Sequence, residues 1–293
     1  MRLEDIPKRF RIDKHKRFRL SDHDPADCCG LTVDKAEAKA MLAEGVARLT
    51  ELQQRLYADN RWAVLIVLQG MDAAGKDSLI KHVMSGVNPQ GVEVTPFKQP
   101  SADELDHSFL WRIARRLPSR GRIGIFNRSH YEDVLVVRVH PELLASSQMP
   151  PSLQGKKFWQ HRFDDIRGFE HHLARSGTLV LKFFLNISRE EQRRRFLARL
   201  DEPDKNWKFS MGDVAERRLW PKYMAAYEDA IRETSREHAP WYVVPADNKW
   251  FTRLVVAGAL VEALEGLKLS YPRVTGEKRK ELEKARRALT TGR

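Results

Sequence analysis

A glycine-rich segment, GMDAAGKDS from Gly70 to Ser78, limits the possible folds of this chain more than any other feature. It matches the pattern G-x-x-x-x-G-K and follows a continuous apolar run from Ala63 to Leu68. Such a run, half of it β-branched, fits a strand buried on both faces of a parallel sheet. Between a strand and a helix, glycines let backbone N–H groups turn inward around a phosphate, and the helix N-terminus adds its positive dipole. The segment therefore predicts a phosphate-binding loop.

Further apolar runs predict the rest of the sheet, and helical patterns separate them. Strands are expected at 92–97, 123–126, 179–185 and 241–244. Helices are expected at 34–57, 76–84, 103–116, 158–175, 189–200, 212–235 and 250–267. Alternation of strands and helices predicts βαβ units and a doubly wound α/β sheet. We divide the chain into an N-terminal arm at 1–34, extended over the surface, one domain at 35–268 and a basic tail at 269–293.

The charge of the chain favours a polyanionic partner. Its 293 residues include 52 Lys and Arg against 40 Asp and Glu, a net charge of +12. Nucleic acid, an acidic membrane surface and polyphosphate all fit this excess. Part of the excess lies at 277–293, which reads as a short exposed basic helix, and a solvated surface is a simpler interpretation of it than a binding arm.

Cysteine usage and hydropathy indicate the compartment. Cys28 and Cys29 are adjacent and cannot easily bridge each other, which fits a reducing environment. No stretch is long and apolar enough to span a membrane, and the first residues are too charged for a secretory signal. We therefore expect a cytoplasmic protein with no membrane partner.

Two residues of the loop depart from the common pattern. Lys76 is expected to contact the terminal phosphates, but Asp77 follows it in place of the usual Ser or Thr, and Ser78 comes one position later. Asp72 places a carboxylate against the phosphates, which is tolerable when a divalent cation lies between them. Asp72 is therefore a predicted metal ligand.

A second polar cluster follows the strand expected at 123–126, where ligands collect in open α/β sheets. The guanidinium of Arg128 is expected to donate two parallel hydrogen bonds to phosphate oxygens. The alternative role of Arg128 is a structural ion pair. Glu132 is the best candidate for a second metal-facing carboxylate, and Asn127 or Asp133 could share that work. Asp133 also reads as an ordinary acid at a helix N-terminus.

Basic residues form the remaining candidates. Lys98 follows the weaker strand at 92–97, and Arg116 lies on the next expected helix. The segment 189–222 is basic and contains a short polar loop between two helices, which suits a closing lid. Arg195 and Arg199 lie at i and i+4 on one face of its first helix. Four aromatic residues in this segment or just after it are interpreted as core anchors rather than stacking platforms: Trp207, Trp220, Tyr223 and Tyr227.

Four segments resemble the polyphosphate kinase 2 family. QGMDAAGKD at 69–77 resembles its Walker A segment, in which the Asp after the Lys is usual, and FNRSHYEDVLVVRVHP at 126–141 resembles its second motif. DKNWKFS at 204–210 resembles its lid, and APWYVVPADNKW at 239–250 resembles its last strand-to-helix turn. The Tyr-Glu pair at 131–132 is similar to the one-domain subgroup that accepts both AMP and ADP. Ser78 stands where the family often has Gly.

This resemblance implies a P-loop kinase-like fold similar to thymidylate kinase, with a parallel sheet flanked by helices and a helical lid. It implies reversible, Mg²⁺-dependent transfer (Mn²⁺ is the alternative metal) of a terminal phosphoryl group between inorganic polyphosphate and AMP or ADP. Guanine nucleotides are further expected substrates, and a homo-oligomer is expected.

On this basis we assign roles to individual residues. The expected catalytic residues are Asp72, Lys76, Arg128 and Glu132, of which Asp72 and Glu132 would hold the metal. The expected polyphosphate contacts are Gly70, Ala73, Ala74, Gly75, Lys76, Asp77, Ser78, Arg195, Arg199 and Lys208. The expected nucleotide contacts are Lys98, Arg116, Asn127 and Arg128.

Two other functions compete with this hypothesis. An ATP-dependent nucleoside monophosphate kinase could use the same fold, but it would need a site for the donor adenine beside the loop. A nucleic-acid-binding protein could use the basic surface without chemistry. Against the latter, the basic residues concentrate around the loop and the lid, and the sequence has no helix-turn-helix, RRM or KH signature.

Overall fold

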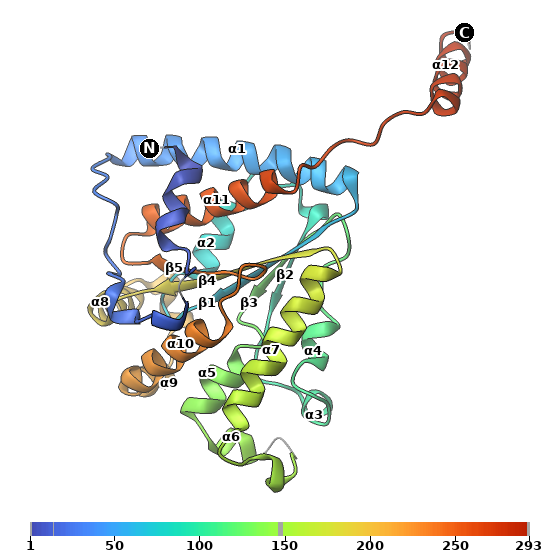
Figure 1. The fold of residues 1–293 in the computed structure, drawn as a ribbon. Coiled ribbons are helices and arrows are strands. Elements are labelled where there is room, and N and C mark those ends of the chain that lie inside the picture. Colours follow the sequence, from blue (N-terminus) through green and yellow to red (C-terminus); the bar gives the residue numbers. More distant parts are fainter. Residues whose placement is uncertain (1, 14, 146–148, 292–293) are drawn as a thin grey trace.

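A five-stranded parallel sheet forms the centre of the computed structural model, which describes residues 2–13, 15–145 and 149–291 (Figure 1). The strand order is β2-β3-β1-β4-β5, and the four neighbouring pairs are parallel. The strands are β1 (Ala63–Gln69), β2 (Val92–Pro96), β3 (Ile123–Asn127), β4 (Thr178–Asn186) and β5 (Trp241–Pro245). All five strand predictions are confirmed, as is the α/β fold.

Strand β1 lies in the middle of the sheet, between β3 and β4. Because it pairs on both sides and helices cover both faces, its seven residues are all buried. After β1 the chain builds β2 and β3 on one side and then β4 and β5 on the other. The carboxyl end of β1 is therefore the point where the winding reverses, which is where open α/β sheets bind ligands. The glycine-rich loop leaves the sheet at this point.

Helices cover both faces of the sheet (Figure 1). The helices α1, α2 and α11 pack on one face, and α5, α7 and α10 pack on the other. The α-helices are α1 (Lys35–Asp59), α2 (Lys76–Val83), α3 (Ala102–Leu105), α4 (Trp111–Ala114), α5 (Glu132–Val139), α6 (Glu142–Ala145), α7 (Phe158–Arg175), α8 (Arg189–Asp201), α9 (Met211–Arg218), α10 (Trp220–Thr234), α11 (Lys249–Gly266) and α12 (Gly276–Thr291). The 3-10 helices are η1 (Leu3–Phe10), η2 (His15–Arg17), η3 (Leu20–Asp22), η4 (Pro89–Gly91), η5 (Pro151–Leu153) and η6 (Pro203–Lys208).

Two predicted helices are each divided in the structure. The segment 103–116 forms α3 and α4 with a turn between them, and 212–235 forms α9 and α10. The second division has a local cause. Pro221 lies in the first turn of α10, where proline needs no backbone N–H partner, whereas in a continuous helix it would remove a hydrogen bond.

The N-terminal segment is not an extended surface arm. It forms three 3-10 helices, and its apolar side chains belong to the hydrophobic core. The backbone N–H of Ile12 donates to the Trp241 carbonyl of β5 at 2.9 Å. Helix η1 packs on α11 at Gly258, where an added Cβ would lie 2.4 Å from the Leu3 carbonyl oxygen. The buried apolar residues of the segment are Ile6, Phe10, Ile12, Phe18 and Leu20.

A buried ion pair ties β4 to the helices on one face of the sheet. The Lys182 ammonium donates to Glu170 at 2.5 Å, to the Tyr131 hydroxyl at 2.9 Å and to the Thr234 carbonyl at 2.9 Å. The Tyr131 hydroxyl in turn donates to Glu170 at 2.8 Å. Burial lowers the pKa of Lys182 to about 8, although Glu170 favours its charged form. The network fixes the residue that immediately precedes α5.

Replacing Glu170 with alanine is expected to lower the free energy of unfolding by about 3–5 kcal/mol, because it leaves a buried lysine without its counter-charge. Urea unfolding of the wild type and the variant would measure this. The double variant Glu170→Leu with Lys182→Met is the control, since an apolar pair of similar volume should restore most of the loss. A single variant as stable as the wild type would contradict the structural role of the pair.

Candidate active site

The glycine-rich loop between β1 and α2 has a strained backbone. Gly75 has φ +106°, and Ala73 adopts φ +64°, which is uncommon for a residue with a side chain. The Lys76 ammonium donates to the Gly70 carbonyl at 2.6 Å and to the Met71 carbonyl at 3.3 Å. Burial lowers the pKa of Lys76. The loop therefore holds a buried ammonium group at the centre of its own turn.

A buried arginine of α8 holds the loop from outside. Nη1 of Arg195 donates to the carbonyls of Ala73 and Ala74 at 2.9 and 3.0 Å, and its Nη2 donates to the Ala246 carbonyl at 2.6 Å. Its Nε donates to Glu191 at 2.7 Å. These bonds occupy the carbonyl groups of the loop and connect the loop to the turn after β5. Arg195 thus holds the loop in place, and its predicted contact with polyphosphate stays a prediction.

Gln192 adds a second contact between α8 and the loop. Its side-chain amide donates to the Asp72 carbonyl at 3.0 Å. Gln192 was not among the predicted site residues. Its position in the helix that follows the carboxyl end of β4 was the available signal.

The segment after β3 lies against the loop. Arg128 has φ +66°, and its backbone N–H donates to the Leu68 carbonyl of β1 at 3.1 Å. Its Nη2 donates to Asp72 at 3.1 Å, and its Nη1 lies 3.7 Å from Glu132. Burial raises the pKa of Glu132, while Arg128 acts in the opposite direction. The four predicted catalytic residues thus form one cluster, since Lys76 and Asp72 share the loop.

Two further bonds connect the loop to the second motif. The Asn127 amide donates to Asp77 at 2.8 Å, so the residue that replaces the usual Ser or Thr has a specific partner. Next to it, the Gln69 amide donates to the Ser129 hydroxyl at 3.1 Å. Side chains therefore join the last residue of β3 to α2, and the last residue of β1 to the segment after β3.

The predicted metal ligands supply two carboxylates. The described residues contain no group of three or more His, Cys, Asp or Glu side chains that could hold a metal. Asp72 and Glu132 both lie beside the Arg128 guanidinium. One or two carboxylates, completed by phosphate oxygens and water, are the common ligand set for Mg²⁺. The two residues fit such a site, in which the substrate supplies the other ligands.

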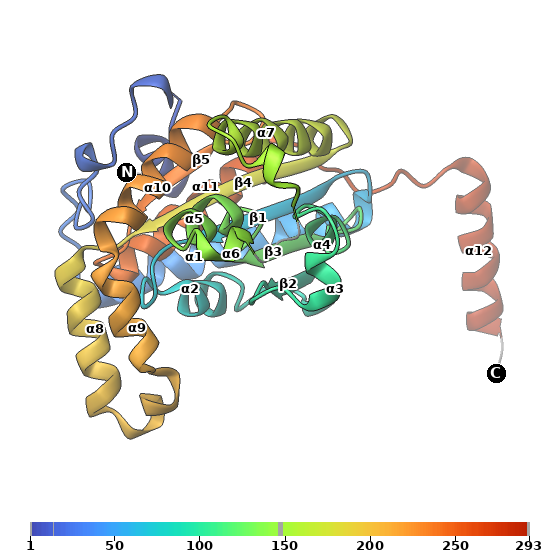
Figure 2. The same ribbon diagram turned by 90° about the horizontal axis from the view of Figure 1, so that it is seen from below.

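A cleft of about 810 Å³ opens above the loop. It lies between the loop, the ends of β2 and β3, the first residue of α11 and the lid formed by α8, η6 and α9, which project from the body in Figure 2. Its acidic lining residues are Asp72, Asp77, Glu202 and Asp213. Its basic lining residues are Lys76, Lys98, Arg128, Arg195, Arg199, Lys205 and Lys249. The excess of basic groups makes the cleft suitable for a polyanion.

The cleft includes most, though not all, of the predicted contacts. Lys98, Asn127 and Arg199 line it, whereas Arg116 is exposed and lies outside the residues that do so. The arginine buried on α4 is Arg112, which donates to the Lys98 carbonyl at 3.0 Å. The side chain of Lys208 lies outside those that the structure describes.

The lid also contains an exposed aromatic residue. Trp207 is 78% exposed and lines the cleft, so its interpretation as a core anchor is wrong. Tyr223 and Tyr227 are buried as expected, and Trp220 packs against the core. The difference arises because η6 forms the tip of the lid, where no core is available.

Residues at the start of α11 complete the wall of the cleft and were not predicted. Lys249 lines it, and Arg253 donates to the Ser78 hydroxyl at 3.2 Å. Burial lowers the pKa of Lys249, and the nearby Arg195 guanidinium lowers it further. The signal for Lys249 was its position soon after β5, in the segment 239–250 that resembles a family motif, and Arg253 lies one turn further along α11.

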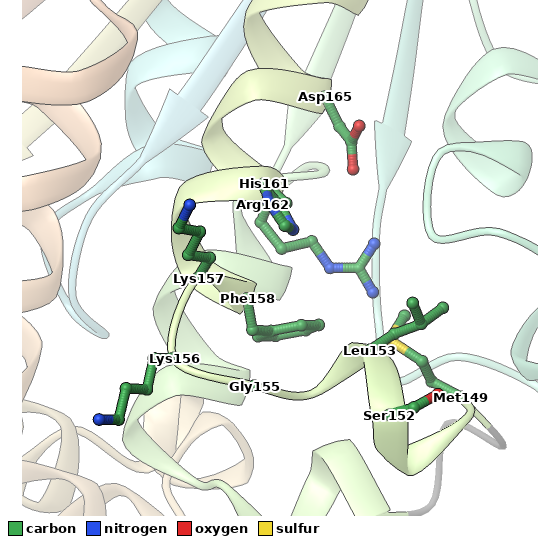
Figure 3. A pocket seen from close by; sticks show the side chains of 10 residues that line it. All are labelled: Met149, Ser152, Leu153, Gly155, Lys156, Lys157, Phe158, His161, Arg162 and Asp165. Carbon is green, nitrogen blue, oxygen red and sulfur yellow. The ribbon is translucent and has the colours of Figure 1, made fainter.

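A second hollow of about 420 Å³ lies at the start of α7, beside η5 (Figure 3). Arg162 lines it, and its guanidinium carbon lies 4.1 Å from the centre of the Phe109 ring and 5.1 Å from that of Phe158. Burial raises the pKa of Asp133 to about 6, although the Arg162 guanidinium acts in the opposite direction. Of the predicted site residues that the structure describes, none lines this hollow.

Comparison with known proteins decides the family. A family model described as polyphosphate kinase 2 matches residues 32–271. The chain belongs to the polyphosphate kinase 2 family. The resemblance inferred from the four motifs is thereby confirmed.

Members of the polyphosphate kinase 2 family match nearly the whole chain. A Rhodopseudomonas palustris protein named ADP-polyphosphate phosphotransferase is 52% identical over 283 residues, which are 96% of this chain and 98% of that protein. A Meiothermus ruber protein named AMP/ADP-polyphosphate phosphotransferase is 49% identical over 265 residues, 90% of this chain and 95% of its own. The crystal structure of polyphosphate kinase 2 from Arthrobacter aurescens has a TM-score of 0.85 and 41% identity, and the match covers 95% and 96% of the two chains. Among the described residues, no helix is long and apolar enough to cross a membrane.

Proposed function

We propose that this protein transfers the terminal phosphoryl group of inorganic polyphosphate reversibly to AMP and ADP. The observation that carries the proposal is the cleft, in which basic residues from four parts of the fold surround a phosphate-binding loop. The printed names of the Rhodopseudomonas and Meiothermus relatives support the choice of donor and acceptors. We extend the acceptors to guanine nucleotides, and we propose a cytoplasmic homo-oligomer.

The donor chain would lie on the loop, with its end at Lys76. Arg195 occupies the Ala73 and Ala74 carbonyls, which would leave the N–H groups of the loop to face the donor phosphates. Arg199, on the lid, would follow the chain away from the loop. Lys249, which lines the cleft near Arg195, would add a further positive charge beside the donor chain.

The acceptor phosphate would lie beside Arg128 and Lys98, at the ends of β3 and β2. Its ionised oxygen would attack the terminal phosphorus of the donor, forming a new P–O bond while the bridging P–O bond breaks. The leaving group is a polyphosphate chain one unit shorter. No general base is required, because the attacking oxygen is already ionised near neutral pH, so alignment and charge neutralisation supply most of the catalysis.

Asp72 and Glu132 would hold the proposed Mg²⁺ ion. When bound, the metal supplies charge neutralisation at the phosphate oxygens. The protein contributes two carboxylates whose spacing is maintained by Arg128 between them. Their pairing with this arginine keeps both groups from repelling an incoming phosphate.

An assay of nucleotide conversion tests the proposal. Purified protein with Mg²⁺, polyphosphate and AMP or ADP, and with no ATP added, is expected to form ADP and ATP. Formation of product from AMP would place the chain with the AMP- and ADP-accepting members of the family. Excess EDTA is expected to abolish conversion, and added Mg²⁺ should restore it.

The same assay distinguishes the main alternative. Conversion only when ATP is supplied would make the protein an ATP-dependent nucleoside monophosphate kinase. Binding to DNA in preference to polyphosphate, with no conversion of either nucleotide, would favour a nucleic-acid-binding protein.

A further inference from the structure

The C-terminal helix α12 stands apart from the body of the protein (Figures 1 and 2). The core ends at Leu269, which is buried, and the N–H of Ser270 donates to Asp59 at 3.2 Å. From 271 to 290 every described residue is exposed. The proposed transfer reaction uses none of these residues.

The helix carries a cationic face. Lys280, Lys284 and Arg287 recur at i, i+4 and i+7, so they lie on one side of the helix. The exposed Leu282 and Leu289 lie on the opposite side, as do Lys278 and Arg286, and Glu277 and Glu283 flank the three basic residues. The basic residues of α12 are Lys278, Arg279, Lys280, Lys284, Arg286 and Arg287, against Glu277, Glu281 and Glu283.

We propose that the cationic face of α12 is a second binding surface for long polyphosphate chains, separate from the cleft. This inference rests on the proposed function, which gives the protein a polyanionic substrate that can extend far beyond the cleft. Charge complementarity favours this ligand, because the face presents basic groups at regular spacing. Two leucines bury too little apolar surface for stable docking on a membrane.

Because α12 lies far from the cleft, its contribution to polyphosphate affinity should depend on the length of the polyphosphate. Helix α11 begins at Lys249 in the wall of the cleft and carries the chain about 27 Å away over its 18 residues. The linker to α12 starts at that far end. Only a polyphosphate long enough to reach from the cleft to the tail can contact both surfaces. Such a chain gains from the high effective concentration of the second surface, whereas a short one does not.

The test compares two sets of substitutions in the full-length chain. The charge variant combines Lys280→Gln, Lys284→Gln and Arg287→Gln, which preserve helix propensity. The control variant combines Leu282→Ala and Leu289→Ala on the opposite face. For each protein, KM and kcat are measured with long-chain polyphosphate and with tripolyphosphate. Binding of long-chain polyphosphate without nucleotide is measured by calorimetry at two salt concentrations.

We expect the charge variant to bind long-chain polyphosphate about tenfold more weakly, with KM raised by a similar factor and a smaller salt dependence. Its kcat, and its KM for tripolyphosphate, should equal those of the wild type, and the control variant should behave as the wild type throughout. Unchanged binding of the long chain, an equal loss with both substrates or an equal loss in the control variant would each overturn the inference.

The outcomes separate this inference from the proposed function. If the wild type converts nucleotide and the charge variant binds long-chain polyphosphate equally well, the role of α12 is disproved and the proposed function stands. A wild type without polyphosphate-dependent conversion would remove the proposed function itself. A tail-dependent affinity that is higher for DNA than for polyphosphate at equal phosphate concentration would assign the surface to nucleic acid and overturn the inference.

Discussion

Replacing Lys76 with alanine is expected to lower kcat for polyphosphate-dependent conversion about 100- to 1,000-fold, the usual cost of removing one preorganised electrostatic contact to a transition state. The ammonium is buried and held by the Gly70 and Met71 carbonyls, so it is already located where the donor phosphates would bind. Steady-state kinetics with saturating polyphosphate would measure the effect.

The stability of the Lys76 variant provides an independent check. Burial lowers the pKa of Lys76, which means that the fold disfavours its charged form. Its removal also breaks the two bonds to the Gly70 and Met71 carbonyls, so the melting temperature of the variant is measured to separate loss of activity from unfolding. Lys81→Ala, an exposed position on the same helix, is the matched control and should retain normal turnover. Near-normal turnover of the Lys76 variant would show that the assigned role is wrong.

The second large effect is expected at Arg195. Arg195→Met should lower the free energy of unfolding by about 3 kcal/mol, because the buried Glu191 loses its buried partner and keeps the exposed Arg194 as its ion-pair partner. It should also lower kcat about 100-fold or more, since the loop carbonyls lose the donors that fix their direction. Urea unfolding and steady-state kinetics on the same preparation would measure the two effects.

Two companion variants distinguish positioning from direct contact with substrate. Arg195→Lys should rescue little, because one ammonium cannot reach the loop and the Ala246 carbonyl together. Arg199→Met, one turn further along the helix, should raise KM for polyphosphate with little change in stability. If Arg195→Met changed only KM for polyphosphate, Arg195 would be a substrate contact, as its spacing with Arg199 first suggested.

The sequence identified the sheet and the loop because their signals are local. Strands β1, β3 and β5 are nearly continuous apolar runs, β4 is interrupted in its middle by Lys182, and the loop has fixed spacing between its glycines and Lys76. The core residues of the N-terminal segment were missed because Ile6 and Phe10 stand alone among charged residues. A few isolated apolar residues do not show that a segment packs against a distant helix.

The role of Arg195 illustrates a different limit. Helical spacing shows that Arg195 and Arg199 share a face, but it does not show which loop that face meets. Arg195 lies one turn closer to the sheet, where the carbonyls of the loop and of the turn after β5 converge, and it becomes buried. Arg199 lies beyond this contact and remains partly exposed. The same argument applies to Lys249, whose function depends on the relative position of β5 and β1.

The bonds from Arg195 and Gln192 also determine which part of the lid can move. The inner turns of α8 are fixed to the loop, so any hinge must lie further out, between Arg199 and the end of α9. Opening of the lid would then widen the outer cleft and move Trp207 without changing the shape of the loop. The loop loses its conformational entropy once, when the protein folds, and this cost does not recur in each catalytic cycle. The moving element needs only to admit and release substrates, and the geometry of the donor site stays the same from one turnover to the next.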